Sequence, residues 1–263
     1  MNLKGKVAVI SGGASGLGLA AARRFISQGA RCAILDINED KGNALISELG
    51  DSAMFFKVDV TDENSVAAAI SETISAFGAV HINGNFAGIG SAMRTINKDG
   101  AFPIDRFQKV IEVNLVGTFN VLRLCAEKMG NNKLLDSDGS RGVIINTASA
   151  AAYEGQIGQV AYSASKAGIV GMTLPLARDL AVMGIRVNTI VPGLIATPLM
   201  MGGGAELTPE IEASLKPLTG QVLFPSRLGR ADEVAHVAQM LVENNYMNGE
   251  CVRIDGGIRM QPR

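Results

Sequence analysis

The sequence predicts an α/β fold: a Rossmann-like, doubly wound, mostly parallel seven-stranded sheet with helices on both faces, in a single domain. Three observations support this prediction. Short apolar runs alternate with longer amphipathic segments, a pattern typical of parallel βαβ units. A glycine-rich turn separates the first apolar run from a helical segment. The 263 residues contain neither an internal repeat nor a linker-like change in composition, so we expect one domain.

The expected strands span residues 7–10, 31–35, 53–58, 80–85, 142–147, 186–191 and 251–254. The expected helices include residues 19–28, 63–77, 105–129 and 160–183, and the polar stretches 89–105, 131–141 and 197–221 are expected loops. Right-handed crossovers place the carboxyl ends of parallel strands at one edge of the sheet. We therefore expect a functional site at that edge.

The first turn contains four glycines, and three of them, Gly12, Gly16 and Gly18, form a spaced motif. Glycine lets the backbone approach a pyrophosphate, and the helix that follows offers free N–H groups to it. The spacing Gly-x3-Gly-x-Gly differs from the standard G-x-G-x-x-G pattern. The second apolar run ends in Asp36, whose carboxylate can accept both ribose hydroxyls of an adenosine.

Ser149, Tyr162 and Lys166 are the most informative residues for chemistry. A tyrosine and a lysine four residues apart on a helix share one face. A phenol, with an ordinary pKa of about 10, works as an acid or base at neutral pH only if a positive charge lowers that pKa. Lys166 can supply this charge, and an oxidised nicotinamide ring is a second such cation.

Composition excludes several classes of protein. A net charge of −1 argues against nucleic acid as a main partner. Cys32, Cys125 and Cys251 lack ligand-like spacing, so we expect buried thiols in a reducing compartment and no metal. No apolar run approaches the length of about 18 residues expected of a membrane span. The short stretch before the first strand leaves no room for a cleavable presequence, so we expect a cytoplasmic protein.

Along its whole length the chain resembles the short-chain dehydrogenase/reductase family. The residues that carry this resemblance are Gly12, Gly16, Gly18, Asp59, residues 85–88, Asn114, Ser149, Tyr162, Lys166, residues 192–193 and Thr197. Residues 142–149, 161–166, 224–229 and 255–262 are similar to the family's mitochondrial 3-hydroxyacyl-CoA dehydrogenase subgroup, which also oxidises hydroxysteroids. The resemblance implies an NAD-dependent oxidoreductase that interconverts a secondary alcohol and a ketone, with 3-hydroxyacyl-CoA and 3-oxoacyl-CoA as the expected pair.

The resemblance also implies roles for individual residues. Tyr162 is the expected acid/base, and Ser149 is expected to hold the substrate oxygen, with Gln159 beside the substrate. Lys166 is expected to lower the Tyr162 pKa and to bind the nicotinamide ribose. Asn114 resembles a residue that supports a water relay from that lysine; alternatively, it is an asparagine in a helix interior that makes a packing hydrogen bond.

The implied NAD contacts follow the order of the chain. Ser15, Leu17 and the three glycines are expected at the pyrophosphate, Asp36 at the adenosine ribose, Asp59 and Val60 at the adenine, Ala87 and Gly88 near the nicotinamide, and Ile195 and Thr197 at the carboxamide, with Tyr162 and Lys166 adjacent. Asp59 could instead be only the N-cap of the next helix.

The fourth strand departs from the family pattern. His81 replaces a usual Asp, Asn83 and Gly84 replace apolar residues, and Phe86 replaces a second Asn. An asparagine and a glycine inside a central strand weaken it and leave a polar group that needs a partner. The sequence therefore does not determine how the fourth strand packs beneath the cofactor.

Alternative functions remain open on the sequence alone. The same residues suit a hydroxysteroid dehydrogenase, a general carbonyl reductase or a 3-oxoacyl carrier-protein reductase. A non-catalytic NAD-binding assembly or sensor subunit is an alternative of another class.

Apolar residues and a triple glycine in residues 197–224 predict a lid over an acyl chain or ring system. Family members resembling this chain form tetramers, so a homotetramer is expected.

Overall fold

The computed structural model describes residues 1–201, 215, 216 and 218–262. Its centre is a seven-stranded parallel sheet with the strand order β3-β2-β1-β4-β7-β8-β9. The strands are β1 (Val7–Ser11), β2 (Arg31–Asp36), β3 (Ala53–Lys57), β4 (Ile82–Asn85), β7 (Gly142–Thr147), β8 (Ile185–Pro192) and β9 (Cys251–Ile254). The predicted Rossmann-like sheet is confirmed.

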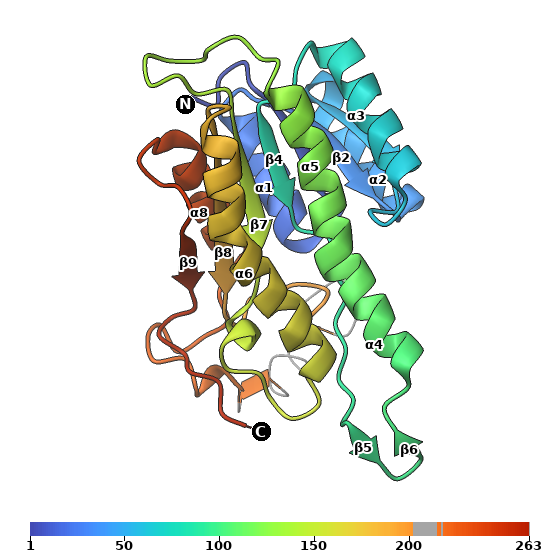
Figure 1. Ribbon diagram of the computed structural model, residues 1–263. Coiled ribbons are helices and arrows are strands. Elements are labelled where there is room, and N and C mark those ends of the chain that lie inside the picture. The colour runs from blue at the N-terminus through green and yellow to red at the C-terminus, as the bar shows by residue number, and fades with distance from the viewer. Residues whose placement is uncertain (202–214, 217, 263) are drawn as a thin grey trace.

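Helices cover both faces of the sheet (Figure 1). One face packs against α1 (Gly16–Ser27), α2 (Glu39–Leu49) and α8 (Ala231–Glu243); the other packs against α3 (Glu63–Phe77), α5 (Gly117–Met129) and α6 (Val160–Ala181). Each face buries its own apolar cluster, which is why the central strands read as continuous apolar runs. All five residues of β1, for example, are buried.

Two segments differ from the sequence-based expectation. The single helix expected over residues 105–129 is divided into α4 (Ile104–Ile111), a π-helical turn (Glu112–Val116) and α5. The expected loop 89–105 contains a small hairpin of β5 (Ile96–Asn97) and β6 (Gly100–Ala101), which extends from the body below α4 in Figure 1.

The unusual residues of β4 are accommodated by side-chain pairing. The Asn83 side chain is fully buried and donates to the Val9 carbonyl at 3.3 Å and to Asn85 Oδ1 at 3.2 Å. Asn85 Nδ2 donates in return to Asn83 Oδ1 at 2.7 Å and to Asn146 Oδ1 at 2.9 Å. The Phe86 ring lies against Gly84, where a Cβ would come within 2.8 Å of it. The buried side-chain amide of Asn83, for which the sequence indicated no partner, therefore has hydrogen-bond partners in the fold.

His81 precedes β4, and its Nδ1 accepts a hydrogen bond from the Val7 N–H at 3.1 Å. Burial lowers the pKa of His81 from the ordinary 6.5 to about 4. Because the unfolded chain takes up the proton at the higher pH, the stability contributed by neutral His81 is complete above the unfolded pKa and is lost as pH falls through the folded pKa.

We therefore expect stability to fall between about pH 7 and about pH 5, by about 1 kcal/mol more in the wild type than in His81→Gln after allowance for partial exposure. The glutamine oxygen can still accept the Val7 N–H but does not titrate. Urea unfolding of both proteins at the two pH values measures this difference. Equal losses in the two proteins would show that His81 does not cause the acid sensitivity.

The strand order reverses between β1 and β4, so their carboxyl ends open into a crevice. The glycine turn follows β1, and residues 86–89 follow β4. The same edge of the sheet receives the end of β7 and the start of α6 (Figure 1). Within the described part of the chain, no helix has the length and apolar character needed to cross a membrane.

Candidate active site

The expected catalytic residues converge at this edge. Ser149 follows β7 and caps a short 3-10 turn (Ala150–Ala152), where its Oγ accepts the Ala151 N–H at 3.2 Å. Tyr162 and Lys166 lie one turn apart near the start of α6. The Lys166 ammonium lies 5.7 Å from the centre of the Tyr162 ring and donates to the Thr147 carbonyl at 2.8 Å. The predicted shared helix face is therefore confirmed.

Asn114 is fully buried in the π-helical turn between α4 and α5. Its Oδ1 accepts the Ile89 N–H at 2.8 Å, and its Nδ2 donates to the Ile89 carbonyl at 3.0 Å and to Ser165 Oγ at 3.0 Å. A Cβ placed on Gly88 would lie 3.2 Å from Asn114 Oδ1 and 3.6 Å from Lys166 Nζ. Asn114 thus makes packing hydrogen bonds and also lies beside the lysine, so both readings of this residue have a structural basis.

The pKa of Tyr162 shifts in the direction opposite to that predicted. Burial raises the pKa of the phenol above its ordinary value, and the Ser149 hydroxyl opposes this shift only in part. Lys166, whose ammonium lies 5.7 Å from the centre of the Tyr162 ring, does not reverse this shift. A positive charge that entered the cleft would lower the Tyr162 pKa.

The glycine turn is closely packed against neighbouring backbone. A Cβ on Gly12, whose φ is +67°, would lie 2.6 Å from the Ala87 nitrogen, and a Cβ on Gly18 would collide with the Gly12 carbonyl. Ser15 lies at the N-cap of α1, but its side chain makes no capping hydrogen bond. The first N–H groups of α1 and the Ser15 hydroxyl therefore face the crevice with hydrogen-bonding capacity to spare.

The Asp36 carboxylate is fixed by two backbone donors. Its Oδ2 accepts the Ala14 N–H at 3.0 Å, and its Oδ1 accepts the Asn38 N–H at 3.0 Å. Each carboxylate oxygen can accept a further hydrogen bond, so the group is preorganised for a diol.

Asp59 does not cap α3, because Asp62 holds that position. Asp59 Oδ1 instead accepts hydrogen bonds from the Thr61 N–H at 2.9 Å and from the Thr61 hydroxyl at 2.7 Å.

These groups surround a cleft of about 350 Å³. Of the residues predicted to bind the cofactor, those lining it are Gly12, Ser15, Gly16, Leu17, Gly18, Asp36, Asp59, Val60, Ala87, Gly88 and Thr197. Ser149, Tyr162 and Lys166 do not line this cleft; Lys166 adjoins it at Gly88, where an added Cβ would lie 3.6 Å from Lys166 Nζ. Ile195 does not line this cleft; its side chain borders a separate cavity on the side of α8. Gln159 Oε1 accepts the Gln156 N–H at 3.0 Å, just before Tyr162.

Several residues of the site were not found from the sequence. Leu35, Val58, Ile89, Lys109 and Val113 also line the cleft. Phe86, Pro198 and Leu199 line it too and belong to segments that the sequence had singled out, as does Ile37 next to Asp36. Lys109 lies near Asp59, where its charge lowers the pKa of that carboxyl in addition to the larger effect of the Thr61 hydrogen bonds. Ser165 and the Thr147 carbonyl hold Asn114 and Lys166 respectively. Nothing in the local sequence distinguishes these residues from ordinary helix and strand positions.

A glycine turn at a helix N-terminus, a preorganised carboxylate after the second strand and a serine, tyrosine and lysine at the same crevice define a dinucleotide-dependent oxidoreductase. The family model for short chain dehydrogenases matches residues 6–207. The chain therefore belongs to the short-chain dehydrogenase family, and it is an oxidoreductase.

Named relatives are similar over the whole chain. The chain is 54% identical to a 3-hydroxyacyl-CoA dehydrogenase type-2 of Bos taurus and 53% identical to that of Homo sapiens, each match covering 99% of this chain and 98% of the relative. The crystal structure of a 3-hydroxyacyl-CoA dehydrogenase type-2 from Mycobacterium avium superposes with a TM-score of 0.91 at 41% identity, and all of both chains is covered.

Proposed function

We propose that this protein uses NAD to oxidise a 3-hydroxyacyl-CoA to the 3-oxoacyl-CoA. The observation that carries the proposal is the placement of Ser149, Tyr162 and Lys166 beside a cleft whose lining suits a dinucleotide. The relatives named above share the whole length of the chain. The test is the appearance of reduced nicotinamide when the protein, NAD and a short 3-hydroxyacyl-CoA are mixed; NAD binding without turnover would favour a non-catalytic binding subunit.

Four residues of the chain have separate roles in the proposed reaction. Bound NAD would accept the hydride from the carbinol carbon of the substrate. Tyr162 accepts the hydroxyl proton at its phenolate oxygen, and Ser149 donates a hydrogen bond to the substrate oxygen as negative charge develops there. Lys166 would contact the ribose of a bound nicotinamide and, together with the charge of that ring, would stabilise the phenolate; Asn114 holds the segment beside the lysine.

The Asp36 carboxylate determines the choice of coenzyme. It is held by two backbone N–H groups at the end of β2, and Ser15, Ile37 and Asn38 around it provide no cation. A 2′-phosphate would be repelled there, so we expect kcat/KM for NAD to exceed that for NADP by at least about tenfold, or about 1.4 kcal/mol. Asp36→Ala should lower the ratio of kcat/KM for NAD to kcat/KM for NADP. Equal kcat/KM values for the two coenzymes in the wild type would refute the assignment.

The acyl-CoA substrate is supported by the apolar segment after β8. Leu199 lines the cleft and is 54% exposed, and Leu223 and Phe224 are 76% and 84% exposed. Val222, in contrast, is buried and packs on the body of the domain. The triple glycine and the middle of the predicted lid lie outside the described residues. Each methylene of an acyl chain buried here would contribute up to about 0.8 kcal/mol, and exposed Arg94, Lys98 and Lys216 are candidate partners for the CoA phosphates.

The proposed assembly is a homotetramer. Among the described residues, β9 is an edge strand whose one pairing partner is β8, and all four of its residues are half-buried. A bare edge of this kind favours pairing with or covering by another chain. We expect light scattering at micromolar concentration to give a mass of four chains, and a monomer under these conditions would contradict the proposal.

The proposed setting is fatty acid metabolism in a reducing compartment, the cytoplasm. Cys32 and Cys125 are buried free thiols, and burial raises the pKa of each. Thiols of this kind are common in proteins that are not exposed to an oxidising environment. The prediction that Cys251 is buried is wrong, because Cys251 lies in the edge strand β9 and is only partly covered.

A further inference from the structure

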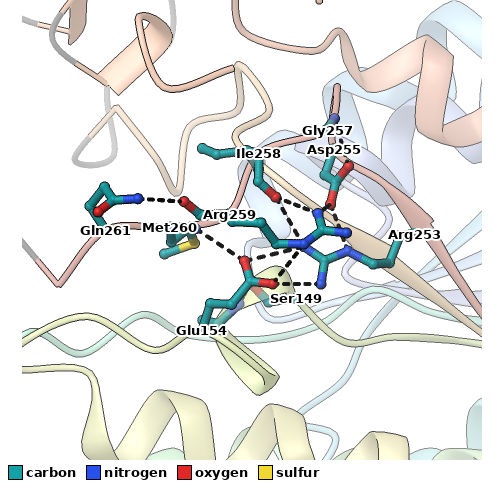
Figure 2. Close-up of polar contacts among 10 residues, drawn as sticks. Ser149, Glu154, Arg253, Asp255, Gly257, Ile258, Arg259, Met260 and Gln261 are labelled. Carbon is teal, nitrogen blue, oxygen red and sulfur yellow. Dashed lines mark hydrogen bonds and ion pairs between the residues drawn. The ribbon is translucent and has the colours of Figure 1, made fainter. Parts of the chain in front are cut away.

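The segment of residues 150–159 connects Ser149 to the helix that carries Tyr162, and it is tied to the C-terminal tail, residues 258–262. These two parts of the chain are about a hundred residues apart in sequence, yet they lie side by side (Figure 2).

Glu154 is the centre of this contact. Its carboxylate is only 19% exposed and accepts from Arg253 Nη1 at 2.9 Å, from Arg253 Nη2 at 3.3 Å and from the Met260 N–H at 3.0 Å. Arg259 Nε lies 3.4 Å from the same carboxylate. Burial acts to raise the pKa of Glu154, but the Arg253 and Met260 hydrogen bonds outweigh it and leave that pKa below its ordinary value. Glu154 is thus ionised at neutral pH.

Glu154 is coupled to Ser149 by one compact turn. The Ala152 N–H donates to the Ser149 carbonyl at 2.9 Å, and the Glu154 N–H donates to the Ala150 carbonyl at 3.0 Å. The Ser149 hydroxyl is itself bound to the Ala151 N–H within this turn. A displacement of Glu154 therefore moves the backbone that sets the direction of the Ser149 hydroxyl.

The tail also holds the far end of the segment. Gln156 Nε2 donates to the Gln261 carbonyl at 2.9 Å, and the Ile157 N–H donates to the Pro262 carbonyl at 3.0 Å. The Gln159 carbonyl then accepts the Ser163 N–H at 2.7 Å in the first turn of α6. The tail is thus connected to both ends of the catalytic set.

The contact is anchored to the sheet through Arg253 of β9. Arg253 Nε binds Asp255 at 2.6 Å, and its guanidinium lies 5.6 Å from the centre of the Tyr153 ring. The guanidinium therefore reaches Glu154 from a strand whose own position is fixed by pairing with β8. A bidentate arginine–carboxylate pair held this way fixes orientation as well as distance.

We propose that Glu154 is a positioning residue, which together with Arg253 and the C-terminal tail holds Ser149 in the orientation that stabilises the developing alkoxide. This inference rests on the role proposed above for Ser149. Glu154, like Ser149 and Tyr162, does not line the cleft, and it is connected to the catalytic set through the turn that it shares with Ser149. We therefore expect the ion pair to affect stabilisation of the substrate oxygen and not binding of the dinucleotide.

The test is Glu154→Gln, which keeps the size of the side chain and removes its charge. We expect kcat to fall by about tenfold, with KM and the Kd for NAD changed by less than about twofold. The matched control is Glu48→Gln, which removes an arginine–carboxylate pair with Arg23 on the surface near α1 and α2 and should leave kcat unchanged. If Glu154→Gln does not fold, Arg259→Gln, at a side chain that is 61% exposed, should lower kcat by about threefold in the same way.

A double-mutant cycle with Ser149→Ala separates positioning from a general loss of structure. If Glu154 acts through Ser149, adding Glu154→Gln to Ser149→Ala should lower kcat by less than about twofold further. The proposal would be overturned if the two single-variant losses of kcat multiplied in the double variant, or if kcat were unchanged in Glu154→Gln. It would also be overturned if Glu154→Gln lost NAD affinity by the same factor as kcat. A Ser149→Ala protein with nearly full activity would instead refute the proposed function of Ser149, so the two failures are distinguishable.

Discussion

Tyr162→Phe is expected to lower kcat by at least about 10²-fold, the usual contribution of a general acid or base. The substitution keeps the buried aromatic ring but removes the phenol oxygen. Neither neighbour can replace it as the proton acceptor, because the Lys166 ammonium only donates and the Ser149 hydroxyl is not a base at neutral pH. The Kd for NAD, measured by isothermal titration calorimetry, should stay within about twofold.

Tyr246→Phe is the matched control for this experiment. Tyr246 is 97% exposed and lies after α8, away from the cleft, so its variant should keep wild-type kcat. Retention of more than about a tenth of wild-type kcat by Tyr162→Phe, with chemistry limiting the rate, would show that Tyr162 is not the base.

Lys166→Met is expected to abolish turnover and to make the protein more stable. The Lys166 ammonium is 5% exposed, and burial lowers its pKa from 10.5 to about 8. At neutral pH the folded protein must hold a charged group in a place that disfavours it, whereas methionine fills a similar volume without charge. We expect the free energy of unfolding to rise by about 1–3 kcal/mol while kcat falls by at least about 10²-fold.

The stability gained by Lys166→Met should depend on pH because the pKa of Lys166 is lower in the folded protein than in the unfolded chain. Between the folded and unfolded pKa values the unfolded chain binds the proton and the folded chain does not, so wild-type stability rises with pH in that interval. The advantage of Lys166→Met should therefore be largest below about pH 8 and shrink toward about pH 10.5. Urea unfolding at several pH values measures it, with Lys57→Met, at an exposed ion pair with Glu39, as the control. A less stable Lys166→Met protein would contradict the account.

The sheet could be predicted because its strands are continuous apolar runs. β7 and β9 have the predicted bounds, and β8 (Ile185–Pro192) differs from the expected 186–191 by one residue at each end. α1 begins at Gly16 and not at residue 19, because the glycines that were assigned to the turn already form its first turn of helix. Local periodicity determines such elements, so local sequence is sufficient to find them.

Features that depend on distant contacts could not be predicted. The π-helical turn around Asn114 has no local signature and is held by Ile89 and Ser165. The raised pKa of Tyr162 reflects the depth of its burial, which the spacing to Lys166 does not contain. The pairing of Glu154 with Arg253 joins two separate parts of the chain and becomes visible only in the folded protein (Figure 2).

The proposed substrate class is tested most directly by one comparison of kcat/KM. A 3-hydroxyacyl-CoA series of increasing chain length, the matching acyl carrier-protein substrates and a hydroxysteroid should be assayed with NAD under the same conditions. We expect kcat/KM to be highest for 3-hydroxyacyl-CoA and to rise with chain length until the apolar pocket is filled, by up to about fourfold for each methylene. Turnover of a sterol or a free secondary alcohol with at least about tenfold higher kcat/KM than every 3-hydroxyacyl-CoA would contradict the proposed substrate.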